Sequence, residues 1–441
     1  MEQMVSIMTC SSPAAAGVDI VLLLLVIALG HVTYEGSSGA PIESFTRRAF
    51  GLRGGDVLIS PGSTCFDQAL QQWSLISDSP SSLKKAQAFL LQATYYETSA
   101  RHRDFLRFAV AASAVCRTLV DSRLVMWCSM EGGMLKRAYR SSVLDEGYYH
   151  YELDLPETGI FFLQDQVPLP SFTNDFDSTV GVGVQTGERP LAYLQFLASI
   201  SLKKIFDHIH HFVRESKFLS TWLQSVLTND TAGVPSYAPD IASEDDIPVS
   251  PSAVPKELRR QLESSREALP RDLQWSDDCN DQSTPMPRDG DAGIGAAVIT
   301  AQLRCRFYYT SFALELPYPY IALHHPALIS LELRQHCVSA LRSALRWPLS
   351  MTLLSDEKRL ISHHFTWTQS AITLLCIYVM IQSGQTLGHL CRENLDLREL
   401  KMGIPVQLCW LQDMKAVDGI AEWVWKLFYP CLLNGCHTTT L

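Results

Sequence analysis

The stretch PLAYLQFLASISLKKIFDHIHHFVRES, residues 190–216, indicates the fold class because its apolar residues recur at the interval of an α-helix. Pro190 stands near the start, where a helix tolerates proline because the amides of the first turn have no intrahelical partner. Steps of three and four positions place four apolar residues on one face. They are Leu202, Ile205, Ile209 and Phe212. The segment predicts a long amphipathic helix.

Two helices are predicted on the N-terminal side of this segment. SSLKKAQAFLLQATYYE, residues 81–97, offers Ser81 or Ser82 as an N-cap. DFLRFAVAASAVCRTLV, residues 104–120, follows after a short turn over residues 99–103. Because the connection is short, we expect the two helices to pack as an antiparallel pair.

Helical spacing also runs through most of the remaining chain. The segments are SRLVMWCSMEGGMLKRAYR (122–140), AQLRCRFYYTSFALEL (301–316), PALISLELRQHCVSALRSALR (326–346), AITLLCIYVMI (371–381) and AVDGIAEWVWKLFYPCLL (416–433). The first contains Gly132 and Gly133, each of which costs about 1 kcal/mol relative to Ala inside a helix, and is still predicted to be helical. Strand-like sequence is confined to DVLIS, residues 56–60. The predicted fold is all-α.

The chain is predicted to form one all-α regulatory region, residues 1–441, with two helical halves. The first half covers residues 14–227 and the second covers residues 296–438. Between them, residues 228–295 are rich in Pro, Ser and acidic side chains and form loops around the short amphipathic helix VPKELRRQLESSREALP, residues 254–270.

The charge of the chain argues against a nucleic-acid surface. The formal net charge is −10, whereas phosphate binding requires clustered Lys and Arg. The densest basic stretch, RHRDFLR at residues 101–107, contains Asp104 and is interpreted as the solvated face of a helix. We therefore predict no direct nucleic-acid site.

The twelve cysteines are scattered and form no disulfide framework. Cys116, Cys128, Cys305 and Cys376 lie in apolar helical sequence, which predicts buried free thiols in a reducing compartment. No C-x-x-C pair is present, so a structural zinc module is not expected.

Two apolar runs raise the question of a membrane segment. VDIVLLLLVIALG, residues 18–30, has only ten consecutive apolar residues and no basic residue before it, unlike a membrane span or a secretory leader. We expect a buried core helix there and another at residues 371–381, and no membrane partner.

No constellation of residues predicts catalysis, cofactor binding or metal binding. His208 and His211 share a helix face, and paired histidines recur at 324/325 and 363/364, but none has a third ligand at suitable spacing. GVGVQTG, residues 181–187, lacks the spacing and the preceding strand of a dinucleotide loop. An enzyme is not predicted. If a catalytic site existed, His208, His211 and Glu315 would be the residues to test.

A second stretch, ELDLPETGIFFLQDQVPLP at residues 152–170, is not explained by helical spacing alone. Its prolines stop helix propagation, and Gly159 can adopt positive φ, so residues 160–163 are expected to pack inward at a turn. Its order of residues resembles the E-L-x-L-P-x-S-G-I turn and closing P-x-P of the middle homology region of fungal zinc-binuclear-cluster transcription factors. The matching positions are Trp127, Glu152, Leu153, Leu155, Pro156, Gly159, Ile160, Pro168 and Pro170.

Four other segments resemble the same family in the same order, so that the resemblance spans roughly residues 18–425. They are VLLLLVIALG (21–30), AQAFLLQATYYE (86–97), ELRRQLESSREALPRDLQWSDD (257–278) and LRCRFYYTSFALELPYPYIALHHP (303–326). Departures occur at Glu315 and Leu316, where the family usually has His and Arg, and at Arg266, which replaces a tryptophan. The six-cysteine zinc finger that precedes this region in the family is not among the motifs of the sequence.

The resemblance implies a nuclear regulator of transcription with a large multi-helix regulatory domain, controlling a fungal secondary-metabolite biosynthetic gene cluster. Without its own zinc-cluster domain, such a protein would act through proteins of the transcription machinery or a DNA-binding co-regulator, and could form homo- or heterodimers. Two further readings stay open: a finger is encoded upstream of this sequence, or the domain serves another purpose. The alternative function is a membrane-associated or small-molecule-binding α-helical protein.

Overall fold

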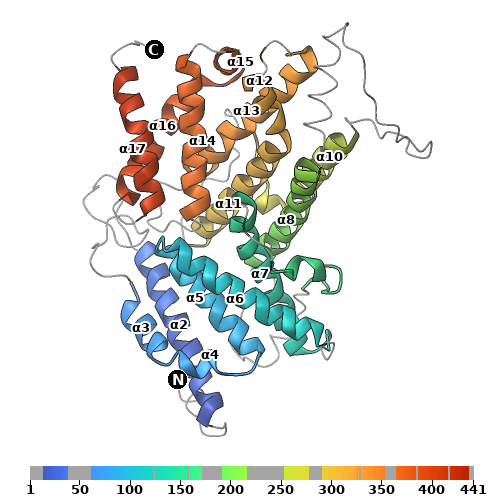
Figure 1. Ribbon diagram of the computed structural model, residues 1–441, viewed down its shortest axis with the longest axis vertical. Coiled ribbons are helices and arrows are strands. Elements are labelled where there is room, and N and C mark those ends of the chain that lie inside the picture. Colours follow the sequence, from blue (N-terminus) through green and yellow to red (C-terminus); the bar gives the residue numbers. More distant parts are fainter. Residues whose placement is uncertain are drawn as a thin grey trace, which may run out of the picture. The chain divides into compact units, whose positions relative to one another are not determined.

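A computed structural model gives the structure of the protein (Figure 1). It describes residues 13–37, 61–122, 126–153, 155, 158–170, 191–215, 253–277, 291–324, 326, 329–352, 364–383, 386–415 and 418–436. Every regular element in these residues is an α-helix or a short 3₁₀ helix, and no strand occurs among them. The prediction of an all-α fold is confirmed. The strand-like residues 56–60 lie outside the described residues.

The chain divides into two compact units, and each unit is assembled from three separate segments of the sequence. Unit 1 consists of Met1–Gln185, Ser355–Gln369 and Gln407–Pro430, and unit 2 consists of Thr186–Leu354, Ser370–Val406 and Cys431–Leu441. Three helices contribute residues to both units. They are α14 (His364–Ser383), α16 (Leu397–Met414) and α17 (Gly419–Cys436). C-terminal residues therefore complete the N-terminal unit.

Unit 1 contains a layer of long helices with short ones beside them. Its elements are α2 (Pro13–Ser37), α3 (Ser63–Gln71), α4 (Ser74–Ser77), α5 (Leu83–Thr98), α6 (His102–Asp121), α7 (Met130–Leu153), η1 (Ile160–Leu163) and most of α17 (Gly419–Cys436). The α5–α6 pair packs closely, as predicted, and its turn covers residues 99–101. Ser82 caps α5, because its side chain accepts a hydrogen bond from the Lys85 amide at 3.3 Å.

Helix α7 begins later than predicted, and this changes the role of its glycines. The helix starts at Met130, so Gly132 and Gly133 lie in its first turn and not in its interior. A Cβ atom at Gly132 would clash with the main chain of Met126. Gly132 therefore allows the main chain at Met126 to pack closely against the start of α7.

Helix α2 differs from the expected buried core helix. It is 25 residues long, and Val21, Leu25, Ala28 and Val32 form its buried stripe. Its other face is also apolar, however, and only 28% of the stretch Gly17–Tyr34 is buried. Within the described residues, α2 is the one unbroken helix that is long and apolar enough to cross a membrane. The predicted core role therefore holds for one stripe of α2 only.

The turn at residues 158–170 is held by side chains from α6 and α7. Gly159 has φ +81°, as the sequence suggested, and Ile160 and Leu163 are buried. Tyr139 donates a hydrogen bond to the Ile160 carbonyl at 2.7 Å, and Arg140 donates to the Val167 carbonyl at 2.5 Å. The expectation for residues 160–163 needs one correction, since Phe162 is 79% exposed. The stretch has a structural role in unit 1.

Unit 2 is a second group of packed helices. Its elements are α8 (Leu191–Glu215), α10 (Ala253–Glu267), η2 (Arg271–Leu273), α11 (Asp291–Glu315), α12 (Pro317–His324), α13 (Leu331–Thr352), α15 (Thr386–Asn394) and parts of α14 and α16. The predicted stripe of α8 is confirmed, because Leu202, Ile205 and Ile209 are buried and Phe212 packs against them. The short helix expected within the acidic region is α10. In Figure 1 it runs beside α8, against which it packs.

The prediction that four cysteines are buried is confirmed for two of them and wrong for the other two. The seven cysteines whose side chains the structure describes are free thiols, and Cys116 and Cys305 are buried. Cys128 and Cys376 are exposed. Cys128 lies in the turn before α7 and not inside the helix expected there, which explains its exposure.

Candidate functional site

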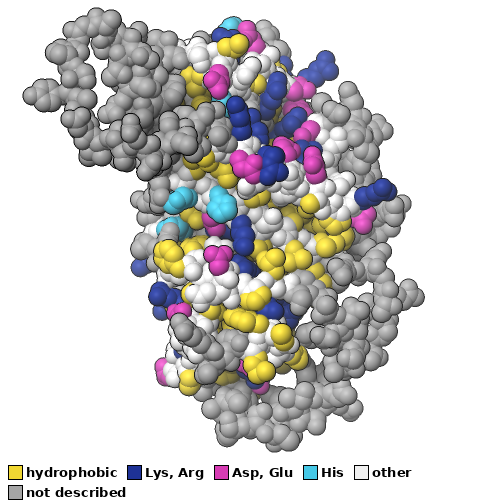
Figure 2. All heavy atoms as spheres, turned by 90° about the vertical axis from the view of Figure 1, so that its right-hand side faces the viewer, with side chains coloured by type: hydrophobic (Ala, Val, Ile, Leu, Met, Phe, Trp, Pro, Cys, Tyr) yellow, Lys and Arg dark blue, Asp and Glu magenta, His cyan; other side chains and the backbone are white. Residues whose placement is uncertain are grey.

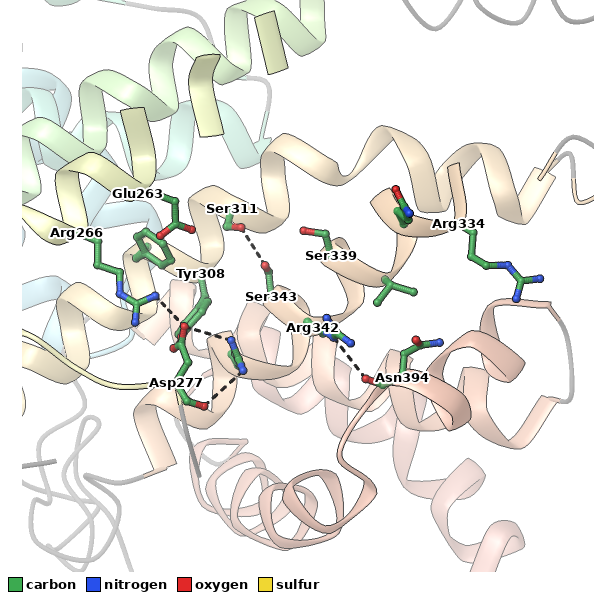
Figure 3. A pocket seen from close by; sticks show the side chains of 14 residues that line it. Glu263, Arg266, Asp277, Tyr308, Ser311, Arg334, Ser339, Arg342, Ser343 and Asn394 are labelled. Carbon is green, nitrogen blue, oxygen red and sulfur yellow. Dashed lines mark hydrogen bonds and ion pairs between the residues drawn. The ribbon is translucent and has the colours of Figure 1, made fainter. Parts of the chain in front are cut away.

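A pocket of about 400 Å³ opens in unit 2 between α10, α11, α13 and α15 (Figure 3). This volume lies in the range of small-molecule sites. Its lining combines arginines, serines and two acids with a small aromatic wall. The residues are Glu263, Arg266, Asp277, Phe307, Tyr308, Ser311, Arg334, Gln335, Val338, Ser339, Arg342, Ser343, Arg346 and Asn394.

Helix α13 supplies half of the lining because its sequence separates an apolar face from a polar one. Leu333, Cys337, Ala340, Leu341 and Ala344 are buried. The polar stripe follows at helical spacing and faces the pocket. It consists of Gln335, Ser339, Arg342, Ser343 and Arg346. Core packing of α13 therefore fixes the direction of its pocket side chains.

Asp277 organises one end of the pocket. Its Oδ2 atom lies 2.7 Å from Nη1 of Arg266 and 3.3 Å from Nη1 of Arg346, and its Oδ1 atom accepts a hydrogen bond from Tyr308. Burial alone would raise the pKa of Asp277, but the Tyr308 and Arg266 hydrogen bonds and the Arg346 charge outweigh it and lower that pKa. Asp277 is therefore an ionised anchor for both arginines.

Arg266, for which the sequence comparison suggested a tryptophan, lies against two aromatic rings. Its guanidinium lies 5.1 Å from the Trp275 ring centroid and 5.4 Å from that of Phe307. These distances are within the range of cation–π contacts. Ion pairing to Asp277 and stacking on two rings hold Arg266 in place as a wall of the pocket.

The opposite end of the pocket carries positive charge that is not balanced in the same way. Arg342 donates one long hydrogen bond, 3.5 Å from Nε to the Asn394 carbonyl, and no carboxylate among the described residues forms an ion pair with it. Arg334 lies 3.9 Å from Glu393. The remaining acid of the lining, Glu263, has a pKa raised by burial. Four guanidinium groups therefore face two carboxylates.

The residues singled out as possible catalytic groups do not form a common site among the described contacts. His208 and His211 are both exposed on α8, whereas Ile205 and Ile209 of the same helix are buried. Glu315, in contrast, is 1% exposed. A carboxylate buried to this extent needs partners, and the structure supplies them.

Glu315 is held by residues from α10 and α13. It forms an ion pair with Arg259, and its Oε2 atom lies 2.8 Å from Nδ1 of His336. The His336 ring stacks on Tyr318, with centroids 4.1 Å apart. Burial and the Arg259 charge lower the pKa of His336, so a neutral imidazole donates to the carboxylate. The cluster joins four helices, α10, α11, α12 and α13, at the end of α11.

An acid–histidine–tyrosine network in unit 1 was not predicted. His102 lies 2.9 Å through Nδ1 from the Tyr149 hydroxyl and 3.1 Å through Nε2 from Oδ2 of Asp418. Burial raises the pKa of Tyr149, which opposes a role as nucleophile. Asp418 Oδ1 accepts from the amide of Ile420 at 2.8 Å and so caps α17. These contacts define a structural link.

The metal and nucleotide hypotheses gain no support from the described residues. No group of three or more His, Cys, Asp or Glu residues within that part of the chain could hold a metal ion. The glycine-rich residues 181–187, and the side chains of the histidine pairs 324/325 and 363/364, lie outside the described residues.

The surface drawn in Figure 2 shows Lys and Arg side chains interspersed with Asp and Glu. Helix α10 illustrates the pattern, because Arg260 and Glu257 pair on its exposed side at 2.6 Å. Mixed charge of this kind differs from the single-sign stripe that tracks a phosphate backbone.

Comparison of the chain with models of protein families, with curated proteins and with solved structures gave no match. The class that the structure defines is an all-α protein with a polar pocket in its second unit.

Proposed function

We propose that the protein is a nuclear regulator of transcription that acts through a helical regulatory domain and through partner proteins. The partners would be components of the transcription machinery or a DNA-binding co-regulator, and the controlled genes would include a fungal secondary-metabolite cluster. The order of the segments that resemble the middle homology region carries this proposal.

The structural positions of those segments support it. Residues 21–30 and 86–97 contribute to the core of unit 1, and the turn at Gly159 packs on the same core. Residues 257–278 and 303–326 contribute Leu258, Leu262, Trp275 and Phe307 to the core of unit 2. The segments that carry the resemblance therefore supply core residues of both units, as a regulatory domain of this kind would require.

A reporter assay tests the proposal. The full chain is fused to a heterologous DNA-binding domain, and transcription from its cognate promoter is measured in fungal cells. We expect a change in reporter output. Ile160→Asp, at a fully buried position, should remove the effect, whereas Phe162→Asp, two residues away and exposed, should retain it. A folded fusion that changes transcription in neither direction would refute the proposal.

One observation favours the alternative of membrane association. Leu23, Val26 and Ile27 of α2 are exposed, although the stretch Gly17–Tyr34 has a mean hydropathy of 2.1. A helix that is apolar on all sides is typical of a deeply buried or lipid-contacting position. Cell fractionation separates the two functions: a nuclear pool that needs no detergent supports regulation, and a detergent-requiring pellet supports membrane association.

A further inference from the structure

The distribution of hydrogen-bond donors in the unit 2 pocket points to a type of ligand. Asp277 engages Arg266 and Arg346 at one end, so the negative charge of this carboxylate is already paired. The second acid of the lining, Glu263, has a pKa raised by burial, which favours its neutral form. At the other end, Arg342 has only its long bond to the Asn394 carbonyl. Because a guanidinium carries five N–H donors in a planar fork, most of its donor capacity remains for a ligand.

Hydroxyl groups lie along the same helix as this guanidinium. Figure 3 shows Ser339, Arg342 and Ser343 on α13, with Ser343 bonded across to Ser311 of α11 at 2.9 Å. In the hydrogen bond between Ser311 and Ser343, one hydroxyl donates its hydrogen to the other. The hydrogen of the accepting hydroxyl is then free to donate to a ligand. The pocket therefore offers neutral donors beside a cation.

The aromatic wall adds an apolar side to the same pocket. Phe307 and Tyr308 are 3% exposed each, and both line the pocket from α11. Sites for small organic ligands combine such a wall with a few convergent polar groups. An inorganic ion alone would leave most of the 400 Å³ to water.

We propose that this pocket binds a small organic anion, a carboxylate or a phosphate ester, with its oxyanion held by Arg342 and by the hydroxyls of Ser339 and Ser343. The organic part of the ligand lies toward Phe307 and Tyr308. This proposal is independent of the proposed role in transcription, because it is tested by binding to the purified protein.

The experiment measures binding of two probes, inorganic phosphate and benzoate, to the purified full chain by calorimetry and by thermal shift. Sodium chloride keeps the ionic strength equal in all samples, because screening weakens such contacts. We expect millimolar binding of at least one probe and an increase in the melting temperature with probe concentration. Phosphate binding alone identifies a phosphoryl ligand, and benzoate binding alone identifies a carboxylate.

Matched variants assign the binding to the pocket. Arg342→Gln should reduce the affinity by about tenfold to a hundredfold, as expected for loss of a charge-assisted bidentate contact. Arg342→Lys should reduce the affinity less, since lysine keeps the positive charge and loses only the planar pair of N–H donors. Arg260→Gln, at an exposed arginine of α10 that does not line the pocket, is the control and should bind as the wild type does.

The variants can be compared directly because Arg342 is exposed and lies outside the buried core, so its replacement should leave the fold intact. Circular dichroism and the melting temperature without probe check this. Failure of both probes to bind the wild-type protein would overturn the proposal. Equal binding to the folded Arg342→Gln variant would overturn it as well.

Discussion

His102 and Asp418 lie 316 positions apart in the sequence and 3.1 Å apart in the structure. The contact joins the first turn of α6 to the cap of α17. Because Asp418 is also hydrogen-bonded to amides at the start of α17, one carboxylate both begins that helix and attaches it to unit 1. This relationship makes the C-terminal helix part of the N-terminal unit.

Replacement of Asp418 by Ala should destabilise the protein by about 1–3 kcal/mol, since it removes a helix cap and a buried charge-assisted hydrogen bond. Urea denaturation followed by circular dichroism measures the change. Asp121→Ala is the control. Its pairing with Arg117 at 3.5 Å is half exposed, so its loss should cost less than about 1 kcal/mol. Equal effects of the two substitutions would contradict the role given to Asp418.

Gly159→Ala should destabilise the turn by about 1–2 kcal/mol, because Gly159 has φ +81°. The new Cβ atom would also lie 2.7 Å from Nη1 of Arg117. Gly133→Ala is a matched control in the first turn of α7, where a Cβ meets nothing within 4 Å, and should be neutral or stabilising by up to about 1 kcal/mol. Midpoints of chemical denaturation compare the two variants.

Asp277→Asn should lower stability at pH 7 by about 1–2 kcal/mol, because Arg266 and Arg346 lose their shared carboxylate. The pKa of Asp277 is lowered in the folded protein, so its contribution is complete above the unfolded-state value of about 4 and is lost as the pH falls through the folded value. The difference between wild type and variant should therefore shrink below about pH 4. Denaturation midpoints between about pH 3 and pH 7 measure it, and a difference that grows toward acid would contradict the assignment.

Cysteine labelling should distinguish buried from exposed thiols. Burial raises the pKa of Cys116 to about 11 and that of Cys305 to about 12, so both thiols stay protonated at about pH 8. Cys128 is exposed. Iodoacetamide should modify Cys128 in the native protein and reach Cys116 and Cys305 only after denaturation. Peptide mass spectrometry after timed labelling measures this, and rapid native modification of Cys305 would contradict the packing of α11.

Local sequence patterns predict a helix correctly where its N-cap or the apolar stripe on one face is sufficient to define it. The cap at Ser82 and the stripe through Ile205 and Ile209 depend on neighbours within a few positions, and both predictions are confirmed. The predicted start of α7 is wrong because helix propensity alone does not reveal that the Met126 main chain passes close to Gly132. Helix propensity alone makes Gly132 unfavourable, but the residue has to be glycine because the main chain of Met126 lies too close for a side chain.

The pocket could not be predicted from sequence for a related reason. Ser339 and Arg342 on α13 have the spacing of an ordinary solvated helix face, and nothing local marks them as the wall of a pocket. Asp277 contacts Arg346 from 69 positions away. In the sequence, Arg266 stands out only as a departure from a family pattern, and its partners become visible when α10 and α11 pack together.

Because unit 1 is assembled from three separate segments of the chain, its folding is sensitive to a premature stop codon far downstream of its first segment. A premature stop codon after Val406 would remove α17 and Asp418, leaving His102 and the buried residues around it without their cover. If the chain were divided after Val406, neither fragment would contain all of unit 1. The two fragments would have to associate for the unit to form. Translation that stops at Val406 should therefore disable unit 1, most of which is supplied by residues 1–185.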